Sequence, residues 1–254
     1  MKEGLLSISD LTTAEARAAW PAVKAAILPT GATEQHGPNL EMSCDITIAS
    51  VLAERLARRF HPRVVLLPPF PYGVSSHHLG FTGTLSLRPE TFDAVLGDLA
   101  DSLSAHGLRS ILVVNGHGGN AAPLALSSAK LRDRGFRVAS LAWFGLAADE
   151  ARKIARHTPY NHACEVETSL AMALAPQIVR TAALAPGQVR PLPPHGDPSG
   201  NAKVDLPWRF DELTANGALG DARLATREDG ERLAGLVLDR AAAFLEAFLK
   251  PPAA

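Results

Sequence analysis

Short apolar runs alternate with amphipathic stretches along the chain. The apolar runs predict buried strands at residues 23–28, 64–67, 110–114 and 136–142. Apolar positions recur at helical spacing in the stretches between and after them, at residues 46–59, 89–105, 121–134, 145–156 and 226–249. Strands that alternate with helices are typical of a parallel sheet covered on both faces. We therefore expect an α/β protein with three α/β/α layers and a largely parallel central sheet.

Two further segments complete this outline. Residues 157–176 lead from a loop into a helix that Pro176 ends, and residues 185–210 are rich in Pro and Gly, which predicts a long irregular loop. The chain has 254 residues, enough for one large domain, and no segment has the composition of a linker. We therefore expect a single domain over residues 1–254.

Composition and charge narrow the class of protein. Hydrophobic residues make up 46% and charged residues 20%, which is ordinary for a globular protein with a substantial core. The 25 Lys and Arg residues nearly balance the 26 Asp and Glu residues, so no basic field attracts nucleic acid or anionic lipid. Only two cysteines occur, Cys44 and Cys164, which fits a reducing compartment. Without a signal-peptide pattern or a membrane-length apolar run, we expect a cytoplasmic protein.

Polar side chains gather where predicted strands end, which is where open α/β sheets bind ligands. Glu34 and His36 follow the first strand and lie two residues apart, so an extended backbone points both the same way. Asp45 stands where the next helix begins, and it could either cap that helix or bind a metal. Their grouping directly after a buried strand favours a binding site over an N-cap beside two surface residues.

Two later loops carry similar residues. In NGHGGN, at residues 115–120, glycines around His117 let the backbone pass close to a neighbour. Such a turn could hold a phosphate instead, but it matches neither G-x-G-x-x-G nor the P-loop pattern. His162, Glu165 and Glu167 lie where a loop enters a helix, and the two acids could simply complement the helix dipole.

The mixture of imidazoles and carboxylates suits Zn²⁺, Mn²⁺ or Fe²⁺ better than Ca²⁺, which prefers oxygen ligands. Glu34, His36, Asp45, His117 and one further acid exceed what a single tetrahedral catalytic zinc requires. They suit two ions about 3.5–4 Å apart that share a carboxylate and a water. The sequence therefore predicts two divalent metal ions per chain, Zn²⁺ and/or Mn²⁺, with Fe²⁺ as a further option.

These motifs resemble the creatininase family of amidohydrolases. GATEQHGPNLEMSCD resembles the leading signature of that family, and GFTGTLSL, NGHGGN, HACEVETSL and GALGDARLATREDGERL resemble its later blocks in order. The resemblance implies a three-layer domain, a dinuclear metal centre and usually a homohexamer. It also implies that Glu34, His36, Asp45 and His117 bind metal, with Asp45 as the bridge. By the same resemblance, His162 protonates the leaving nitrogen, and Glu167 orients groups or transfers a proton.

Departures from the family pattern affect the ligand set and the substrate. Creatinine-cleaving members carry a Tyr-Glu pair after the equivalent of His117, and that glutamate binds metal, whereas this chain has Gly118 and Gly119. We expect Glu165, in the block that contains His162, to supply the missing ligand. Thr158 replaces a tryptophan that stacks on creatinine, so we do not expect creatinine as the substrate.

Cys164, His77 and His78 are further candidates for a role in the site. Cys164 replaces a glycine of the family, and we expect a buried filler there rather than a thiolate ligand. His77 and His78 could contact substrate or support the site.

We expect a metal-dependent amidohydrolase that cleaves a non-peptide or cyclic C–N amide bond of a small molecule through a metal-bridging hydroxide. A formamide deformylase of a pyrimidine nucleotide intermediate is an alternative, and its phosphate could bind Arg190, Lys203 and Arg209. A peptidase that trims a modified peptide is a second alternative, although that subgroup tends to have histidine at position 165. The remaining alternatives are a lactonase and a protein that binds metal or a ligand without catalysing a reaction. Trp208 or Trp143 could form a wall of the pocket.

Overall fold

The computed structural model describes residues 4–191 and 207–250. Its sheet has the strand order β2-β1-β3-β4, and every neighbouring pair is parallel. The strands are β1 (Ala25–Thr30), β2 (Val64–Leu66), β3 (Ser110–Asn115) and β4 (Arg137–Ala142). Each lies within two residues of its predicted bounds, and the predicted parallel sheet is confirmed.

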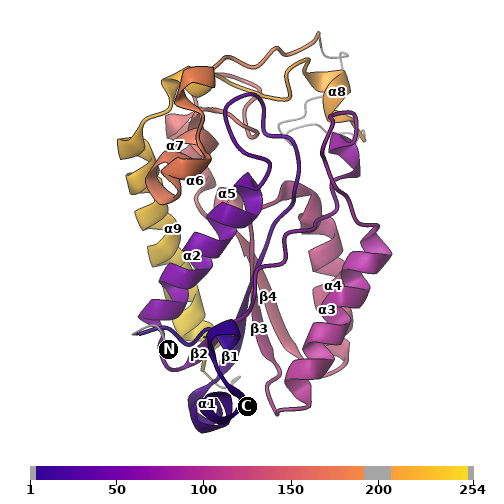
Figure 1. Ribbon diagram of the computed structural model, residues 1–254, viewed down its shortest axis with the longest axis vertical. Coiled ribbons are helices and arrows are strands. Elements are labelled where there is room, and N and C mark those ends of the chain that lie inside the picture. The colour runs from indigo at the N-terminus through magenta and orange to yellow at the C-terminus, as the bar shows by residue number, and fades with distance from the viewer. Residues whose placement is uncertain (1–3, 192–206, 251–254) are drawn as a thin grey trace.

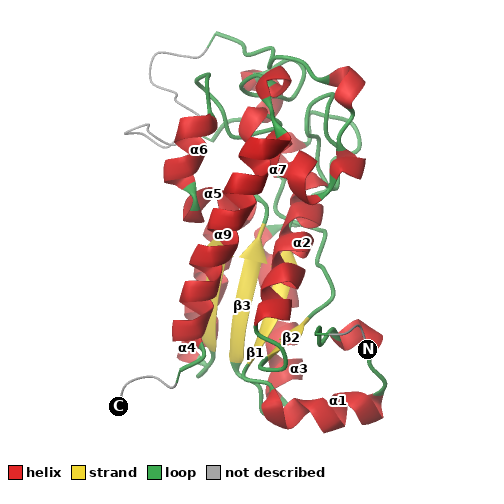
Figure 2. Ribbon diagram, turned by 90° about the vertical axis from the view of Figure 1, so that its left-hand side faces the viewer, coloured by secondary structure: helices red, strands yellow, loops and turns green. Residues whose placement is uncertain are grey.

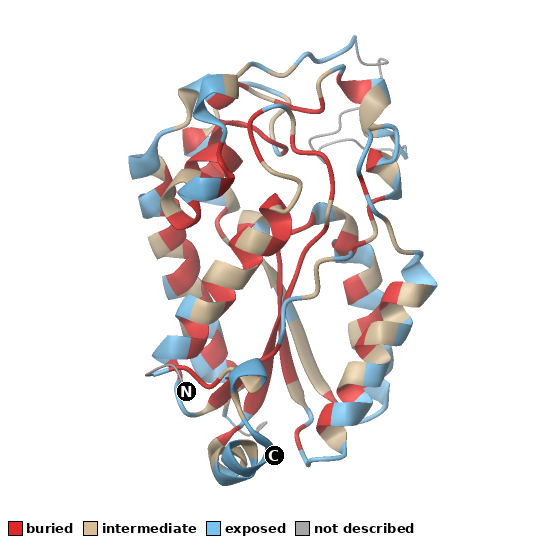
Figure 3. Ribbon diagram, in the orientation of Figure 1, coloured by how far each residue is buried: buried red, intermediate tan, exposed pale blue. Residues whose placement is uncertain are grey.

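Strand β1 shows why the central strands appear in the sequence as continuous apolar runs. All of its residues are buried, because successive side chains point to opposite faces and both faces are covered. Ala25 and Ile27 belong to one hydrophobic cluster, and Ala26 and Leu28 belong to the other. Figure 3 shows the resulting concentration of buried residues along the sheet at the centre of the molecule.

Helices cover both faces and complete the α/β/α layers (Figure 1). On one face lie α2 (Cys44–Arg59), α7 (Glu165–Leu174) and α9 (Arg227–Phe248). On the other face lie α3 (Pro89–Ser104) and α4 (Ala121–Asp133). The three-layer prediction is therefore confirmed.

The helices begin where local chemistry favours a start. The Thr226 side chain accepts a hydrogen bond from Asp229 N and caps α9, and Pro89 opens α3 at its first position. The predicted helix at residues 145–156 is instead two short ones, α5 (Trp143–Leu146) and α6 (Ala148–Ile154), which meet at Ala147. The short helices α1 (Thr13–Ala19) and α8 (Phe210–Leu213) were not predicted.

The carboxyl ends of the strands all point to one end of the molecule. Figure 2 shows the strand arrows directed there, with α6 and α7 at the same end. Short 3₁₀ helices, Ser76–His78 and Gly118–Asn120, lie in the connecting loops. Part of the expected irregular loop at residues 185–210 falls outside the described residues. Within residues 4–191 and 207–250, no helix combines the length and apolar character that crossing a membrane requires.

Candidate metal centre

The loops after β1 and β3, the start of α2 and the segment that leads into α7 bring most of the predicted site residues together. Glu34 and His36 follow β1, Asp45 lies in the first turn of α2, and His117 follows β3. A Cβ atom at Gly116 would clash with the carbonyl oxygen of Asp45. Only glycine therefore lets the β3 loop pack against the start of α2, which explains the residue that precedes His117.

Asp45 stands between two imidazoles. One of its carboxylate oxygens, Oδ1, lies 3.1 Å from His36 Nε2, and the other, Oδ2, lies 3.0 Å from His117 Nδ1. Glu34 Oε1 is 3.2 Å from the same nitrogen of His117. Glu167 Oε1 is 3.9 Å from His36 Nε2. The carboxylate of Asp45 thus faces two separate sets of donor atoms, one on each side.

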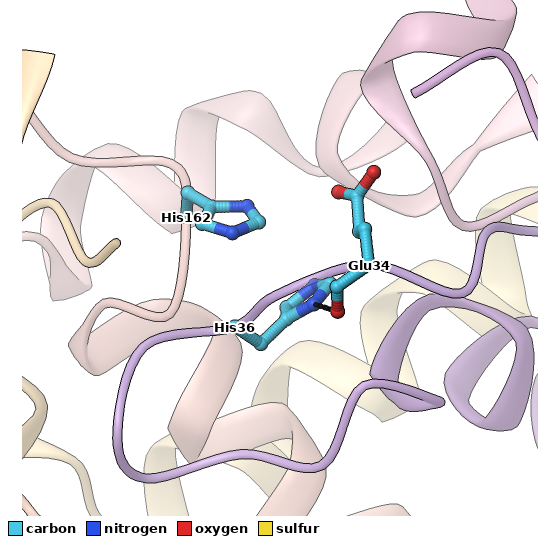
Figure 4. Close-up of side chains that lie close together, drawn as sticks. All are labelled: Glu34, His36 and His162. Atoms are coloured by element: carbon cyan, nitrogen blue, oxygen red, sulfur yellow. Dashed lines mark hydrogen bonds between the residues drawn. The ribbon is translucent and has the colours of Figure 1, made fainter. Parts of the chain in front are cut away.

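These sets form three groups in which one ligand atom of each residue lies within 4.8 Å of the others. The groups are Glu34–Asp45–His117, His36–Cys44–Glu167 and Glu34–His36–His162. All of their members are buried. Figure 4 shows the third group, in which the His162 and His36 rings and the Glu34 carboxylate lie close together. The thiol of Cys44 was not predicted as a donor, because it precedes Asp45 in a helix and resembles a core residue.

Backbone carbonyl groups fix the orientation of both imidazoles. His36 Nδ1–H donates to the carbonyl oxygen of Glu34 at 3.1 Å, drawn as a dashed line in Figure 4. His117 Nε2 lies 3.2 Å from the carbonyl oxygen of Val74 and 3.2 Å from Ser75 Oγ. In each ring the remaining nitrogen faces carboxylates. Histidines that bind metals are typically held in this way, with one nitrogen on a carbonyl group and the other free to coordinate.

The neighbouring carboxylates raise the pKa values of His36 and His117 and so favour positive charge on these imidazoles. Burial alone lowers the pKa of His36, but the carboxylates of Asp45 and Glu167 raise it to about 10. Burial likewise lowers the pKa of His117, and Glu34 and Asp45 outweigh it, so the pKa is raised well above its usual value. Burial raises the pKa of Glu167 to about 7, and the nearby Asp45 and Glu34 charges add to this effect.

Two buried carboxylate oxygens in this cluster make no hydrogen bond, namely Glu34 Oε2 and Asp45 Oδ2, although Asp45 Oδ2 lies 3.0 Å from His117 Nδ1. Leaving a buried anionic oxygen without a hydrogen bond is costly, and a cation bound among these side chains would offset that cost. Imidazole nitrogens and carboxylate oxygens are donors that Zn²⁺ and Mn²⁺ accept. The residues present therefore fit divalent metal ions.

Glu165, the expected replacement ligand, does not join these groups. Its Oε1 accepts a hydrogen bond from Arg156 N at 2.7 Å, and its Oε2 accepts one from Asp221 N at 2.8 Å. Both oxygens are thus used to hold two loops together. Two residues further along α7, Glu167 points Oε1 towards His36 while its Oε2 accepts from Ala163 N at 2.6 Å. The arrangement favours Glu167 over Glu165 as the acid of the second set.

Gly119 stands where creatinine-cleaving members were expected to carry a ligand glutamate. A Cβ atom at this position would clash with the carbonyl oxygen of Val74 and with Nε2 of His117. The absence of a side chain therefore allows the Val74 carbonyl to approach and orient His117. A glutamate here would require the loop that contains Val74 to move.

His162 belongs to the third of these groups, and its imidazole is held in the neutral form. Its ring centroid is 4.3 Å from that of His36, and its Nε2–H donates to the carbonyl oxygen of Gln35 at 2.7 Å. Burial, together with the charge of His36, holds the pKa of His162 well below its usual value. A neutral imidazole in this position can accept a proton and pass it on.

His78 and Gln35 extend the network. Gln35 Nε2 donates to His78 Nδ1 at 2.8 Å, and His78 Nε2 lies 3.3 Å from Glu34 Oε1. Burial lowers the pKa of His78 far below its usual value. His78 thus contacts a proposed ligand, in agreement with the supporting role considered from the sequence. Gln35 was missed, although it stands between Glu34 and His36 in the leading motif.

A cavity of about 440 Å³ opens onto the cluster. Its acidic lining residues are Glu34, Asp45 and Glu167, and its aromatic lining includes Trp143, Phe144, Tyr160 and Phe210. Trp143 is thus a wall residue, as considered from the sequence, whereas Trp208 does not line this cavity in the described part of the chain. Cys164 is buried and also lines the cavity.

Comparison with known proteins identifies the family. The family model for creatininase, described as creatinine amidohydrolase, matches residues 9–245. This chain belongs to the creatininase family. The resemblance inferred from the motifs is confirmed, and the chain is an enzyme, a hydrolase that acts on carbon–nitrogen bonds.

Similar proteins include a curated peptidase and solved creatininase structures. The mycofactocin precursor peptide peptidase of Mycolicibacterium smegmatis is 34% identical over 232 residues, which cover 89% of this chain and 85% of the peptidase. A manganese creatininase has a TM-score of 0.82 and 26% identity, with 97% of this chain and 100% of that chain covered. A creatininase mutant of the Zn–Zn type has a TM-score of 0.79 and 25% identity, with 97% and 99% covered.

Proposed function

We propose that this member of the creatininase family is an amidohydrolase that holds two divalent cations around Asp45. Glu34, Asp45 and His117 would hold one ion. A second ion would be held by His36, Asp45 and Glu167. Zn²⁺ and Mn²⁺ are the candidates, since similar creatininases contain them.

This proposal depends on one observation: the two oxygens of the Asp45 carboxylate face two different imidazoles. Its two oxygens lie 3.1 Å from His36 Nε2 and 3.0 Å from His117 Nδ1. A carboxylate that bridges two ions must present one oxygen to each of them. The buried Oε2 of Glu34, which has no hydrogen-bond partner, supports the same conclusion, because a bound cation would offset the cost of leaving it unpaired.

When bound, a pair of such ions activates water near neutral pH and polarises an amide carbonyl group. The protein side chains then have to move protons. His162 is neutral and lines the cavity, and its Nε2–H is held by the Gln35 carbonyl. This tautomer leaves Nδ1 as the nitrogen that takes up a proton and delivers it to the leaving nitrogen. His162 is therefore the proposed general acid–base residue.

Glu167 changes role in this proposal. The sequence predicted an orienting or proton-transfer function for it, and the contact with His36 supports a ligand function. Glu165 is proposed instead as the residue that fixes the loops at Arg156 and Asp221, which lie near the cavity-lining residues Tyr160 and Leu219, respectively, in sequence.

The substrate is an amide small enough for a cavity of about 440 Å³ to enclose its reacting part. A small cyclic or non-peptide amide meets this condition. A short peptide is the second candidate, which the 34% identity to a precursor peptide peptidase favours. A lactone remains a chemical alternative, since an alkoxide leaving group depends less on proton donation. The homohexamer stays a prediction.

The alternative function as a formamide deformylase of a nucleotide has less support than the amidohydrolase function. Arg209 forms an ion pair with Asp211 at 2.7 Å, and Arg190 Nε donates to the carbonyl oxygen of Asp211 at 3.1 Å. Lys203 lies outside the described residues. Arg190 and Arg209 therefore have partners within the protein.

Metal removal tests this function. The protein would be stripped with a chelator and assayed against formamides, lactams, hydantoin-like rings and short peptides. We expect turnover of at least one of these classes by the metal-loaded protein, loss of that turnover on stripping, and its return with two equivalents of Zn²⁺ or Mn²⁺. Full turnover by the metal-free protein would contradict the proposal.

A further inference from the structure

The cavity above the metal centre has one cationic wall residue. Arg152, on α6, lines the cavity, and it is the only Lys or Arg of the described residues that does so. The other charged lining residues are the three acids Glu34, Asp45 and Glu167. Arg152 is exposed, so a molecule that enters from solvent can reach it. The cavity therefore has an acidic part, where the metal ions are proposed, and a separate positive charge.

No carboxylate of the described residues neutralises Arg152. Its Nε–H donates to the carbonyl oxygen of Ala148 at 3.0 Å, one helical turn earlier. The acids of the same helix pair elsewhere, Asp149 with Arg240 and Glu150 with Lys153 and Arg232. The hydrogen bond to Ala148 steadies the guanidinium and leaves its terminal N–H groups for another acceptor.

A second hydrogen-bond donor of the cavity lacks a partner. Trp143 is only 5% exposed, it lines the cavity, and its Nε1–H makes no hydrogen bond within the described residues. A buried donor of this kind is normally satisfied in the functional state. Trp143 and Arg152 thus both belong to the cavity lining, and Arg152 is the exposed, charged donor of the two.

We propose that the substrate carries a carboxylate separate from its scissile amide, and that Arg152 binds this carboxylate. The planar guanidinium presents parallel N–H groups that match the two oxygens of a carboxylate. A carboxylate is favoured over a phosphate because Arg152 is the single Lys or Arg among the described residues that lines the cavity, whereas Arg209 is already paired with Asp211. This inference rests on the proposed metal-dependent function, because the metal centre orients the amide end of the substrate.

Hydroxamates that chelate divalent ions provide the test. The monohydroxamates of malonic, succinic, glutaric and adipic acid place a carboxylate at increasing distances from the metal-binding group. Each has a neutral twin in which a carboxamide replaces the carboxylate. Acetohydroxamate lacks the second group and reports the metal centre alone. Dissociation constants would be measured by calorimetry with the Zn²⁺-loaded wild type, Arg152→Gln and Lys153→Gln. Lys153 is the matched control, as an exposed neighbour that pairs with Glu150.

We expect one chain length to bind wild type about tenfold more tightly as the carboxylate than as the carboxamide. Arg152→Gln should bring this ratio to about one, and Lys153→Gln should preserve it. Acetohydroxamate should bind all three proteins equally. These results together would support carboxylate recognition by Arg152 and exclude a general effect of surface charge.

Other outcomes separate the two proposals. If acetohydroxamate binds but no carboxylate exceeds its carboxamide twin, the inference about Arg152 is overturned and the metal centre stands. A tenfold preference that persists in Arg152→Gln assigns the carboxylate to another group and also overturns it. Tighter binding of a phosphonate of equal length would replace the carboxylate with a phosphate. If no hydroxamate binds the metal-loaded wild type, the proposed function fails and this inference fails with it.

Discussion

The acidic residues of α6 and those at the strand ends differ in the groups that face their carboxylates. On the surface, Asp149 pairs with Arg240, and Glu150 pairs with Arg232 at 2.8 Å. In the metal centre, Glu34 and Asp45 face only imidazoles, and each leaves one buried oxygen without a hydrogen-bond partner. Surface carboxylates therefore pair with guanidinium groups, whereas the buried ones face imidazoles and, under the proposed function, would bind metal ions.

The largest expected effect comes from removing the carboxylate between the two imidazoles. Asp45→Ala should lose both ions, because each proposed ion position uses one of its oxygens. Losing metal activation costs several kcal/mol of transition-state stabilisation, so we expect activity to fall by about a thousandfold or more. Metal analysis and steady-state kinetics on the same preparation measure both effects.

The surface cluster supplies the control for this comparison. Asp149→Ala removes an exposed acid that pairs with Arg240 and does not line the cavity. Its metal content and activity should equal those of wild type, since surface ion pairs contribute little. If Asp45→Ala also kept two ions and full activity, the bridging role would be disproved.

His162 should affect chemistry without affecting metal content. In His162→Ala the metal ligands remain, and only the residue that moves the proton is lost. We expect activity to fall by about 10²- to 10⁴-fold, the usual contribution of general acid–base catalysis. Kinetics and metal analysis would be compared with His61→Ala, which changes an exposed histidine. Loss of an ion from His162→Ala would show that this imidazole is a ligand instead.

A smaller effect distinguishes the two acids in the first turn of α7. Glu167→Gln should lose about one ion, because Glu167 faces His36. Glu165→Gln should keep both ions, but it should unfold about 1–3 kcal/mol more easily, because one buried backbone N–H loses its acceptor. Metal stoichiometry and urea unfolding of the metal-free proteins measure these changes. The reverse pattern would restore Glu165 as the ligand.

This pair of acids also shows the limit of sequence reasoning. Glu165 and Glu167 lie two residues apart at the start of a helix, so their side chains point in very different directions. The motif HACEVETSL does not indicate which of the two side chains faces His36. That depends on how α7 packs against α9 and α2, which is a long-range property. The ligands near β1 were easier to predict, since Glu34, His36 and Asp45 share one loop and the helix that follows.

The fold was predictable for a similar local reason. Apolar runs such as residues 110–114 are buried on both faces, and clear start signals such as Thr226 and Pro89 mark the helices. The break at Ala147 between α5 and α6 was missed, because no Pro or Gly stands at that residue to signal it. Arg152 was missed as well. Its side chain reaches the cavity only through the folding of these short helices.

Anomalous diffraction from crystals of the metal-loaded protein, recorded at the zinc and manganese absorption edges, tests the central claim most directly. The account predicts two peaks about 3.5–4 Å apart with the Asp45 carboxylate between them. One should lie beside Glu34 and His117, and the other beside His36 and Glu167. An absence of peaks around Asp45, or a single peak that Glu165 coordinates, would contradict it.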